Sequence, residues 1–167
     1  MIICLDVDYR PGRAVAAGVL IERWEDELPH KELVRAYDQP SSYRPGKFYL
    51  RELPPLLELI DSLPVTVATA VIDWYVWLGE NREPGLGAYL YRALEKKTAV
   101  VGVAKSRFKD AGFAVPVRRG RSRNPLYLTA AGLDIRKAAA GVKRMRGPFR
   151  IPTILKRADR LCRESEG

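Results

Sequence analysis

Residues 65–72 (VTVATAVI) are apolar or β-branched without a break. Such a run has neither the alternation of a strand with one face in water nor the period of an amphipathic helix, so it predicts a strand buried on both faces. Residues 98–103 (TAVVGV) form a second run of this kind. Strands covered on both faces belong to the centre of a sheet that lies between helices. We therefore expect an α/β fold.

The rest of the chain supplies strands and helices around this centre. A Pro-Gly turn near residue 11 separates two runs that predict a hairpin, and the basic turn at residues 118–121 separates two more. Three early strands, followed by helices that alternate with buried strands, predict a mixed sheet flanked by helices in a single domain over residues 1–167. The other predicted strands are residues 2–7, 14–21, 32–37, 113–117 and 124–129, and the predicted helices are 53–63, 84–96, 132–145 and 153–164. Helix 53–63 would begin near two prolines, which a first helical turn tolerates.

The sequence disfavours several classes of protein. No apolar run approaches the roughly 20 residues that span a bilayer, and the N-terminus MIICLDVDYR does not resemble a signal peptide. Two cysteines, Cys4 and Cys162, are too few for a disulfide framework, so we expect a cytoplasmic protein. The single histidine, His30, lies in the charged stretch EDELPHKE, where we expect it on the surface. One histidine and no Gly-rich phosphate loop argue against a zinc site, a Ser-His-Asp triad and a P-loop.

Charge is divided unevenly along the chain. Residues 1–96 carry 11 Lys/Arg and 15 Asp/Glu, a net charge of −4, whereas residues 97–167 carry 18 Lys/Arg and 5 Asp/Glu, a net charge of +13. This division suggests acidic metal ligands in one half and a surface for a polyanion in the other, although basic residues also occur simply as solvated surface. We expect a nucleic-acid partner, DNA or RNA, with contacts from the basic-turn residues Arg118, Arg119 and Arg121.

Two carboxylates occupy unusual positions. Asp6 lies inside an otherwise apolar strand, and Asp73 directly follows the buried run at residues 65–72. Each has an ordinary structural explanation, because Asp6 could turn toward water and Asp73 could cap a loop or a helix. If the two strands are adjacent, both carboxylates lie at the end of the sheet where open α/β sheets bind ligands. Clustered carboxylates repel one another without a cation, and oxygen-only ligands favour Mg²⁺ or Mn²⁺ over zinc.

A resemblance to a known family extends along most of the chain. Residues 43–52 (YRPGKFYLRE) run from a Tyr-x-Pro-Gly loop to an Arg-Glu pair, and this segment resembles the motif of the endonuclease V family. Residues 102–106 (GVAKS) are similar to a second specific signature of that family. Further similar segments, in the family's order, are residues 5–9 (LDVDY), 70–73 (AVID), 149–152 (FRIP) and 156–159 (KRAD).

The resemblance implies an RNase H-like fold and hydrolysis of a phosphodiester near deaminated adenine in DNA or RNA. It implies that Asp6, Glu52 and Asp73 bind Mg²⁺ or Mn²⁺, with Asp159 as a fourth acidic ligand. It implies that Lys105 faces the phosphate and that Tyr43 is inserted beside a base turned out of the stack. Pro45, Gly46 and Ser106 belong to the matching motifs and are expected to contact nucleic acid.

Ordinary roles remain open for three of these residues. Lys105 could be a surface lysine, Tyr43 could be a loop aromatic packed on the domain, and Asp159 could balance its neighbours Arg157 and Arg160.

The sequence departs from the family after Asp73. The family continues with a Gly-rich turn and a His-Pro pair, whereas this chain reads WYVWLG at residues 74–79, and its nearest counterpart to His-Pro is Glu83-Pro84. The aromatic residues of this turn, Trp74, Tyr75 and Trp77, could stack on a base or could lie in the core or at a dimer contact. Two alternatives to an active endonuclease follow: a nucleic-acid-binding module without turnover, and a metal-dependent enzyme that acts on a nucleotide or a modified base.

Overall fold

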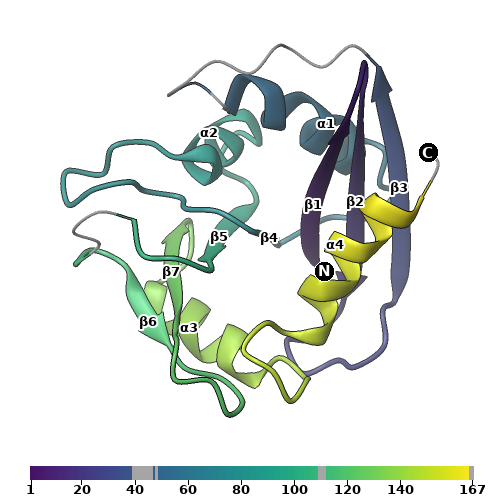
Figure 1. Cartoon of the computed structure of the whole chain (residues 1–167). Coiled ribbons are helices and arrows are strands. Elements are labelled where there is room, and N and C mark those ends of the chain that lie inside the picture. Colours follow the sequence, from purple (N-terminus) through teal and green to yellow (C-terminus); the bar gives the residue numbers. More distant parts are fainter. Residues whose placement is uncertain (39–46, 48, 109–111, 166–167) are drawn as a thin grey trace.

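The computed structural model describes residues 1–38, 47, 49–108 and 112–165. Its centre is a seven-stranded sheet with the order β3-β2-β1-β4-β5-β7-β6 (Figure 1). The strands β1, β4 and β5 run parallel, and every other neighbouring pair is antiparallel. The sheet is therefore mixed, as predicted. The strands are β1 (Ile2–Arg10), β2 (Arg13–Ile21), β3 (Lys31–Asp38), β4 (Thr69–Ile72), β5 (Ala99–Ala104), β6 (Val115–Val117) and β7 (Leu126–Ala131).

The central strand β4 is shorter than the apolar run that predicted it. All four residues of Thr69–Ile72 are buried, whereas Val65 is 40% exposed. The neighbouring strand explains the difference. In the register of β1 and β4, Ile2 lies opposite Thr69, so residues 65–67 extend past the paired part of β1. Ala68 makes the bonds that end the ladder, to the Met1 carbonyl and from the Ala99 N–H. The prediction of a strand over residues 65–72 is thus correct for its second half and wrong for its first.

Two helices cover each face of the sheet (Figure 1). The helices α1 (Tyr49–Asp61) and α2 (Leu86–Ala93) bury their apolar sides in one core cluster, against β1 residues such as Ile3 and Leu5. The helices α3 (Ile135–Arg144) and α4 (Thr153–Glu164) do so in a second cluster on the other face, which includes Cys4 and Val101. This is the helix-flanked α/β domain predicted from the sequence. Within the described residues, no helix is long and apolar enough to cross a membrane.

Candidate active site

Three parallel strands deliver polar side chains to one end of the sheet. Leu5 in β1 lies opposite Ile72 in β4, and Ile72 lies opposite Gly102 in β5. The next residues along β1 and β4 are Asp6 and Asp73, so their carboxylates come together where parallel strands end, the usual ligand site of such sheets. Lys105 directly follows β5, and its ammonium forms an ion pair with Asp73. The structure places Asp6 and Asp73 together at one end of the sheet, as expected, and the exposed Lys105 has its ammonium beside them.

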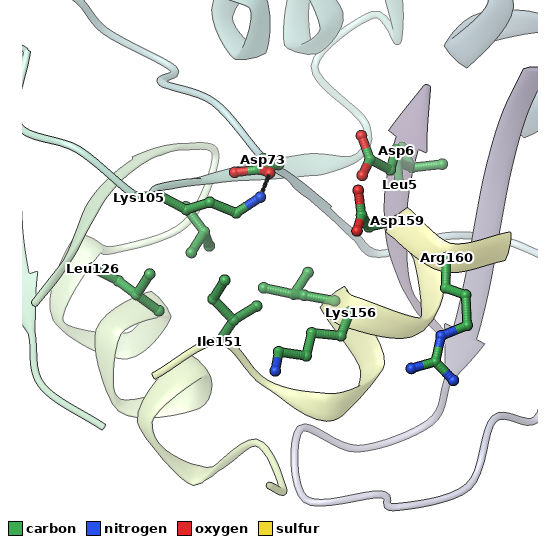
Figure 2. Close-up of a pocket in the computed structure, with 11 residues that line it drawn as sticks. Leu5, Asp6, Asp73, Lys105, Leu126, Ile151, Lys156, Asp159 and Arg160 are labelled. Carbon is green, nitrogen blue, oxygen red and sulfur yellow. Dashed lines mark ion pairs between the residues drawn. The ribbon is translucent and has the colours of Figure 1, made fainter. Parts of the chain in front are cut away.

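The helix α4 closes this end of the sheet and adds Asp159. A cavity of about 190 Å³ lies between α4 and the strand ends. Figure 2 shows the Asp6 and Asp159 carboxylates near one another on one side of the cavity and the Lys105–Asp73 pair on the other. Asp159 also pairs with Arg163 at 2.9 Å, one helical turn along α4. Lys156 and Arg160 complete a basic rim, over apolar walls that include Leu126 and Ile151.

A second hollow, of about 180 Å³, flanks the same carboxylates on the side of α1 and α2. It shares Asp6 and Asp73 with the first cavity and adds Glu52 from α1 and Trp74 from the turn after β4. The four predicted acidic residues thus surround one end of the sheet, with Asp159 on one side and Glu52 on the other. Asp6 lies between them.

Burial and mutual repulsion raise two of the carboxyl pKa values. The pKa of Asp6 rises to about 6, first because the group is buried and further because Asp73 and Asp159 are near, while a hydrogen bond from the Val7 N–H opposes the rise. Burial likewise raises the pKa of Glu52 to about 7, and the charge of Asp6 adds to the rise. Burial is the main cause for both groups, because it disfavours the charged form of a carboxyl.

The donor chemistry of the site fits a hard divalent cation. Its candidate ligands are all carboxylates, which Mg²⁺ and Mn²⁺ prefer, and a cation bound among them would favour the ionised forms of Asp6 and Glu52 that burial disfavours. As the side chains stand, however, no three acidic, histidine or cysteine side chains in the described part of the chain are arranged to hold an ion. Instead, the Lys105 ammonium is the cation beside Asp73.

The position of Glu52 depends on an irregularity in α1 that the sequence pattern did not reveal. The helix begins at Tyr49 rather than at residue 53, so Pro54 and Pro55 lie inside it instead of in its first turn. Because Pro55 has no N–H, the Arg51 carbonyl lacks its usual helical donor. The Tyr9 hydroxyl donates to this oxygen at 3.0 Å, and the Arg51 guanidinium lies 3.7 Å from the centre of the Tyr9 ring. Tyr9 therefore ties the turn that carries Glu52 to β1, a role signalled only by the unusual prolines.

The aromatic turn after Asp73 divides its side chains between the core and the site. Tyr75 is 2% exposed and belongs to a small core cluster. Trp77 packs against the cluster beneath α1 and α2, and its indole N–H donates to the Ala130 carbonyl at 2.9 Å. Trp74 is 36% exposed and lines the hollow beside Glu52. Of the interpretations left open by the sequence, core packing is correct for Tyr75 and Trp77, whereas Trp74 lies outside the core and stacking on a base stays a prediction for it.

The residues predicted to contact nucleic acid differ in their exposure to solvent. Arg118, Arg121 and Ser106 are exposed. Arg119 is only 6% exposed, and its guanidinium donates to the main-chain carbonyls of Phe149 and Arg150 at 3.0 and 3.1 Å. Its prediction as a nucleic-acid contact is wrong, because a buried guanidinium engaged in this way cannot reach a bound strand. Tyr43, Pro45 and Gly46 lie outside the residues that the structure describes.

Comparisons with known proteins agree with this architecture. A model of the endonuclease V family matches residues 1–132. The endonuclease V of Streptomyces avermitilis is 27% identical over an alignment of 184 positions, which covers 96% of this chain and 78% of that protein. A crystal structure of endonuclease V from Streptomyces avermitilis has a TM-score of 0.74 at 24% identity and covers 97% of this chain and 79% of its own.

More distant structures share the fold. Endonuclease V of Bacillus subtilis has a TM-score of 0.80 at 17% identity, over 97% of this chain and 78% of that one. Endonuclease V of Ciona intestinalis, crystallised with a DNA 24mer containing an inosine followed by a ribo-adenosine, has a TM-score of 0.79 at 17% identity, over 98% and 84% of the two chains. The RNase H-like α/β fold expected from the sequence is confirmed. The family model and the shared fold lead to one conclusion: the chain belongs to the endonuclease V family, whose members are nucleases.

Proposed function

We propose that this protein is a Mg²⁺- or Mn²⁺-dependent endonuclease that hydrolyses a phosphodiester near a deaminated, inosine-type base in DNA or RNA. The observation that carries the proposal is the convergence of Asp6, Asp73, Asp159 and Glu52 on one end of the sheet, with Lys105 among them. These side chains come from the strand β1, the helices α1 and α4, and the segments that follow β4 and β5. A purely structural role for any one of them does not account for their meeting.

Each residue has a distinct part in the proposed chemistry. Asp6, Asp73, Asp159 and Glu52 would hold the cation, which supplies Lewis-acid stabilisation of charge on the phosphate oxygens. Lys105 would turn from Asp73 toward the phosphate and stabilise the charge that develops there. Lys156 and Arg160, on the rim of the cavity, would bind the neighbouring phosphates of the strand.

One relative, seen in two crystal structures, supports the choice of substrate. The Ciona intestinalis endonuclease V structures contain DNA with an inosine followed by a ribo-adenosine, and they cover 98% of this chain. The net charge of +13 over residues 97–167 also favours a polyanionic substrate. The cytoplasmic location expected from the sequence stays a prediction.

The test compares cleavage of inosine-containing and unmodified strands, single and double, with Mg²⁺, with Mn²⁺ and with a chelator. Cleavage that needs the ion and falls by about 10²-fold or more in Asp73→Asn is the expected result. A matched pair on one helix adds a control: Glu52→Gln should abolish cleavage, whereas Glu58→Gln, on the exposed side of α1, should not change it.

Three outcomes would contradict the proposal. Equal cleavage by wild type and Asp73→Asn would indicate a contaminating nuclease. Salt-sensitive binding without any cleavage would favour a binding module that lacks turnover. Turnover of a free nucleotide or modified base, with strands left intact, would place the chemistry on a small substrate.

A further inference from the structure

Trp74 is one of few large hydrophobic side chains that the structure leaves exposed, and it lies at the active site. Its indole is 36% exposed and lines the hollow that contains Asp6, Glu52 and Asp73. The opposite side of these carboxylates opens into the cavity with the basic rim of Lys105, Lys156 and Arg160. The site is therefore asymmetric, because cations that suit phosphates line one side and an aromatic surface lies on the other.

The three residues after Trp74 are held in place by hydrogen bonds to other parts of the fold. The Val76 N–H donates to the Thr129 hydroxyl at 2.7 Å, and the Tyr75 hydroxyl donates to the Ser106 carbonyl at 2.8 Å. Trp77 is anchored through its indole N–H to Ala130. These bonds link the turn to β7 and to the segment after β5.

The backbone at Trp74 is also closely packed. A Cβ added at Gly102 in β5 would collide with the Trp74 carbonyl oxygen, so glycine at this position permits the turn to lie directly on the strand. The Tyr75 ring meets the Trp74 indole edge-on, with 6.3 Å between ring centres and an interplanar angle of 84°. An aromatic surface on such a turn loses little conformational freedom when a ligand stacks on it.

We propose that Trp74 is a stacking platform for an unpaired nucleobase next to the scissile phosphate. The phosphate would lie at the carboxylates and the strand on the basic side, which leaves a neighbouring base within reach of the indole. Base–aromatic stacking tolerates every base, since each has a π face, and it requires that the base be unpaired. This inference rests on the proposed nuclease function and deepens it by naming the substrate class.

A consequence for selectivity follows. The family resemblance places a Gly-rich turn where this chain has Trp74, and glycine allows the backbone to approach a ligand while tryptophan presents a flat apolar surface. Stacking on the indole requires that the base be unpaired, but it does not depend on which hydrogen-bonding groups the base carries. We therefore expect the protein to bind single strands much more tightly than duplexes. We expect it to distinguish inosine from other unpaired bases less strongly.

The test uses the full chain in chelator, so that binding is measured without cleavage, and oligonucleotides that carry 2-aminopurine at successive positions. Stacking on the indole quenches 2-aminopurine, so wild type should quench it at one position. Trp74→Leu should abolish this quenching and weaken single-strand binding by about tenfold, and Trp74→Phe should restore most of both. Phe149→Leu removes another exposed aromatic, 61% exposed, and should leave the quenching unchanged.

The proposal is overturned if Trp74→Leu binds and quenches like wild type, or if it binds inosine-containing strands more tightly, which would mean that the indole obstructs the base. Melting temperatures of both variants exclude a folding defect, and the phenylalanine variant keeps the test valid if the leucine variant is unstable. Position-specific quenching in a wild-type protein that never cuts with added Mg²⁺ or Mn²⁺ would contradict the nuclease function alone. Cleavage without quenching at any position would contradict the stacking role alone.

Discussion

Asp6 illustrates a conflict between stability and function at a single residue. Its carboxyl has a pKa of about 6 in the folded chain, mainly because burial disfavours the charged form. A raised folded-state pKa means that the native state binds the proton more tightly than the unfolded state. The resulting stability is therefore present below about pH 4 and is lost as pH rises through about 6. At neutral pH the ionised Asp6 costs stability, which is understandable if the group serves to bind a cation.

Asp6→Asn should accordingly stabilise the metal-free protein. The neutral amide can keep the hydrogen bond from Val7 and removes the buried charge, so the free energy of unfolding at about pH 8 should rise by about 1–2 kcal/mol. The gain should disappear near pH 4, where the wild-type carboxyl is itself protonated. Urea unfolding in chelator at the two pH values measures both effects. Asp61→Asn, which removes an exposed carboxylate, should stay within about 0.5 kcal/mol of wild type, and a loss of stability in Asp6→Asn at the higher pH would contradict the argument.

Lys105 occupies the position where a cation would approach Asp73. Its ammonium pairs with that carboxylate, so a divalent ion must compete with the lysine for it. Lys105→Met should lose cleavage by about 10²-fold or more and yet bind Mn²⁺ about two- to fivefold more tightly, the worth of a partly exposed ion pair.

Titration calorimetry with Mn²⁺ and no nucleic acid measures the ion affinity of Lys105→Met separately from its cleavage activity. Lys156→Met removes the same charge from the rim of the cavity, where the ammonium lies over the Phe149 ring, and should change the affinity less. Weaker Mn²⁺ binding by Lys105→Met would show that the lysine supports the ion rather than competing with it.

At the scale of elements, one buried arginine links the sheet to α4. Arg119 lies two residues after the end of β6. Its guanidinium donates to carbonyls of the segment that leads into α4, including that of Met145. The same segment is tied to the strand ends, because Arg150 donates to the Lys105 carbonyl at 3.1 Å. The helix that carries Asp159 is thus positioned by contacts that are distant in the sequence, in addition to its own apolar face.

Removing this link should loosen α4 in particular. Arg119→Met leaves the buried Met145 carbonyl and the partly buried carbonyls of Phe149 and Arg150 without this donor, so the free energy of unfolding should fall by about 2–3 kcal/mol. Hydrogen exchange should show faster exchange in residues 145–156 than in β1 or β4. Arg118→Met changes the exposed neighbour and should cost less than about 0.5 kcal/mol. Equal destabilisation by the two variants would rule out a special role for Arg119.

At the scale of the whole molecule, the basic half of the chain forms a groove apart from the carboxylates. A groove of about 490 Å³ lies between β6 and α3, which are adjacent in Figure 1, and Arg118 and Lys143 are its charged lining residues. Pro125 lines this groove, and the next residue, Leu126, lines the active-site cavity. We therefore expect a long strand bound at the carboxylates to contact Arg118 and Lys143 as well.

Charge removal tests this surface. Arg118→Gln with Lys143→Gln should weaken binding of a long oligonucleotide and lower the slope of log affinity against log salt by about two, because each of the two cations would neutralise one phosphate. Arg35→Gln with Lys96→Gln removes the same charge from exposed positions on β3 and beyond α2, and should change neither quantity appreciably. Fluorescence anisotropy over a salt series gives both values. Equal effects of the two pairs would mean that only net charge matters.

Much of the architecture was accessible from local pattern. Periodicity and turn residues act over a few positions, so the two hairpins, the buried strands, the four helices and the mixed sheet could be predicted with only their ends in error. The errors have a common cause, which is dependence on a distant part of the chain. The length of β4 depends on where its partner β1 begins, and α1 continues through Pro54 and Pro55 with the Tyr9 hydroxyl donating to the Arg51 carbonyl in place of the missing helical N–H.

The candidate site divides in the same way. Asp6 and Asp73 were predictable because a carboxylate in or beside a buried strand is conspicuous in the sequence itself, and Glu52, Lys105 and Asp159 followed from resemblance to a family. Only the folded chain decided that Arg119 supports α4 while Arg118 faces solvent, and that Trp74 meets the site while Tyr75 enters the core. The physical reason is that burial and electrostatic repulsion depend on distances between residues far apart along the chain. Neighbouring residues of the same type therefore acquire different roles that no local pattern encodes.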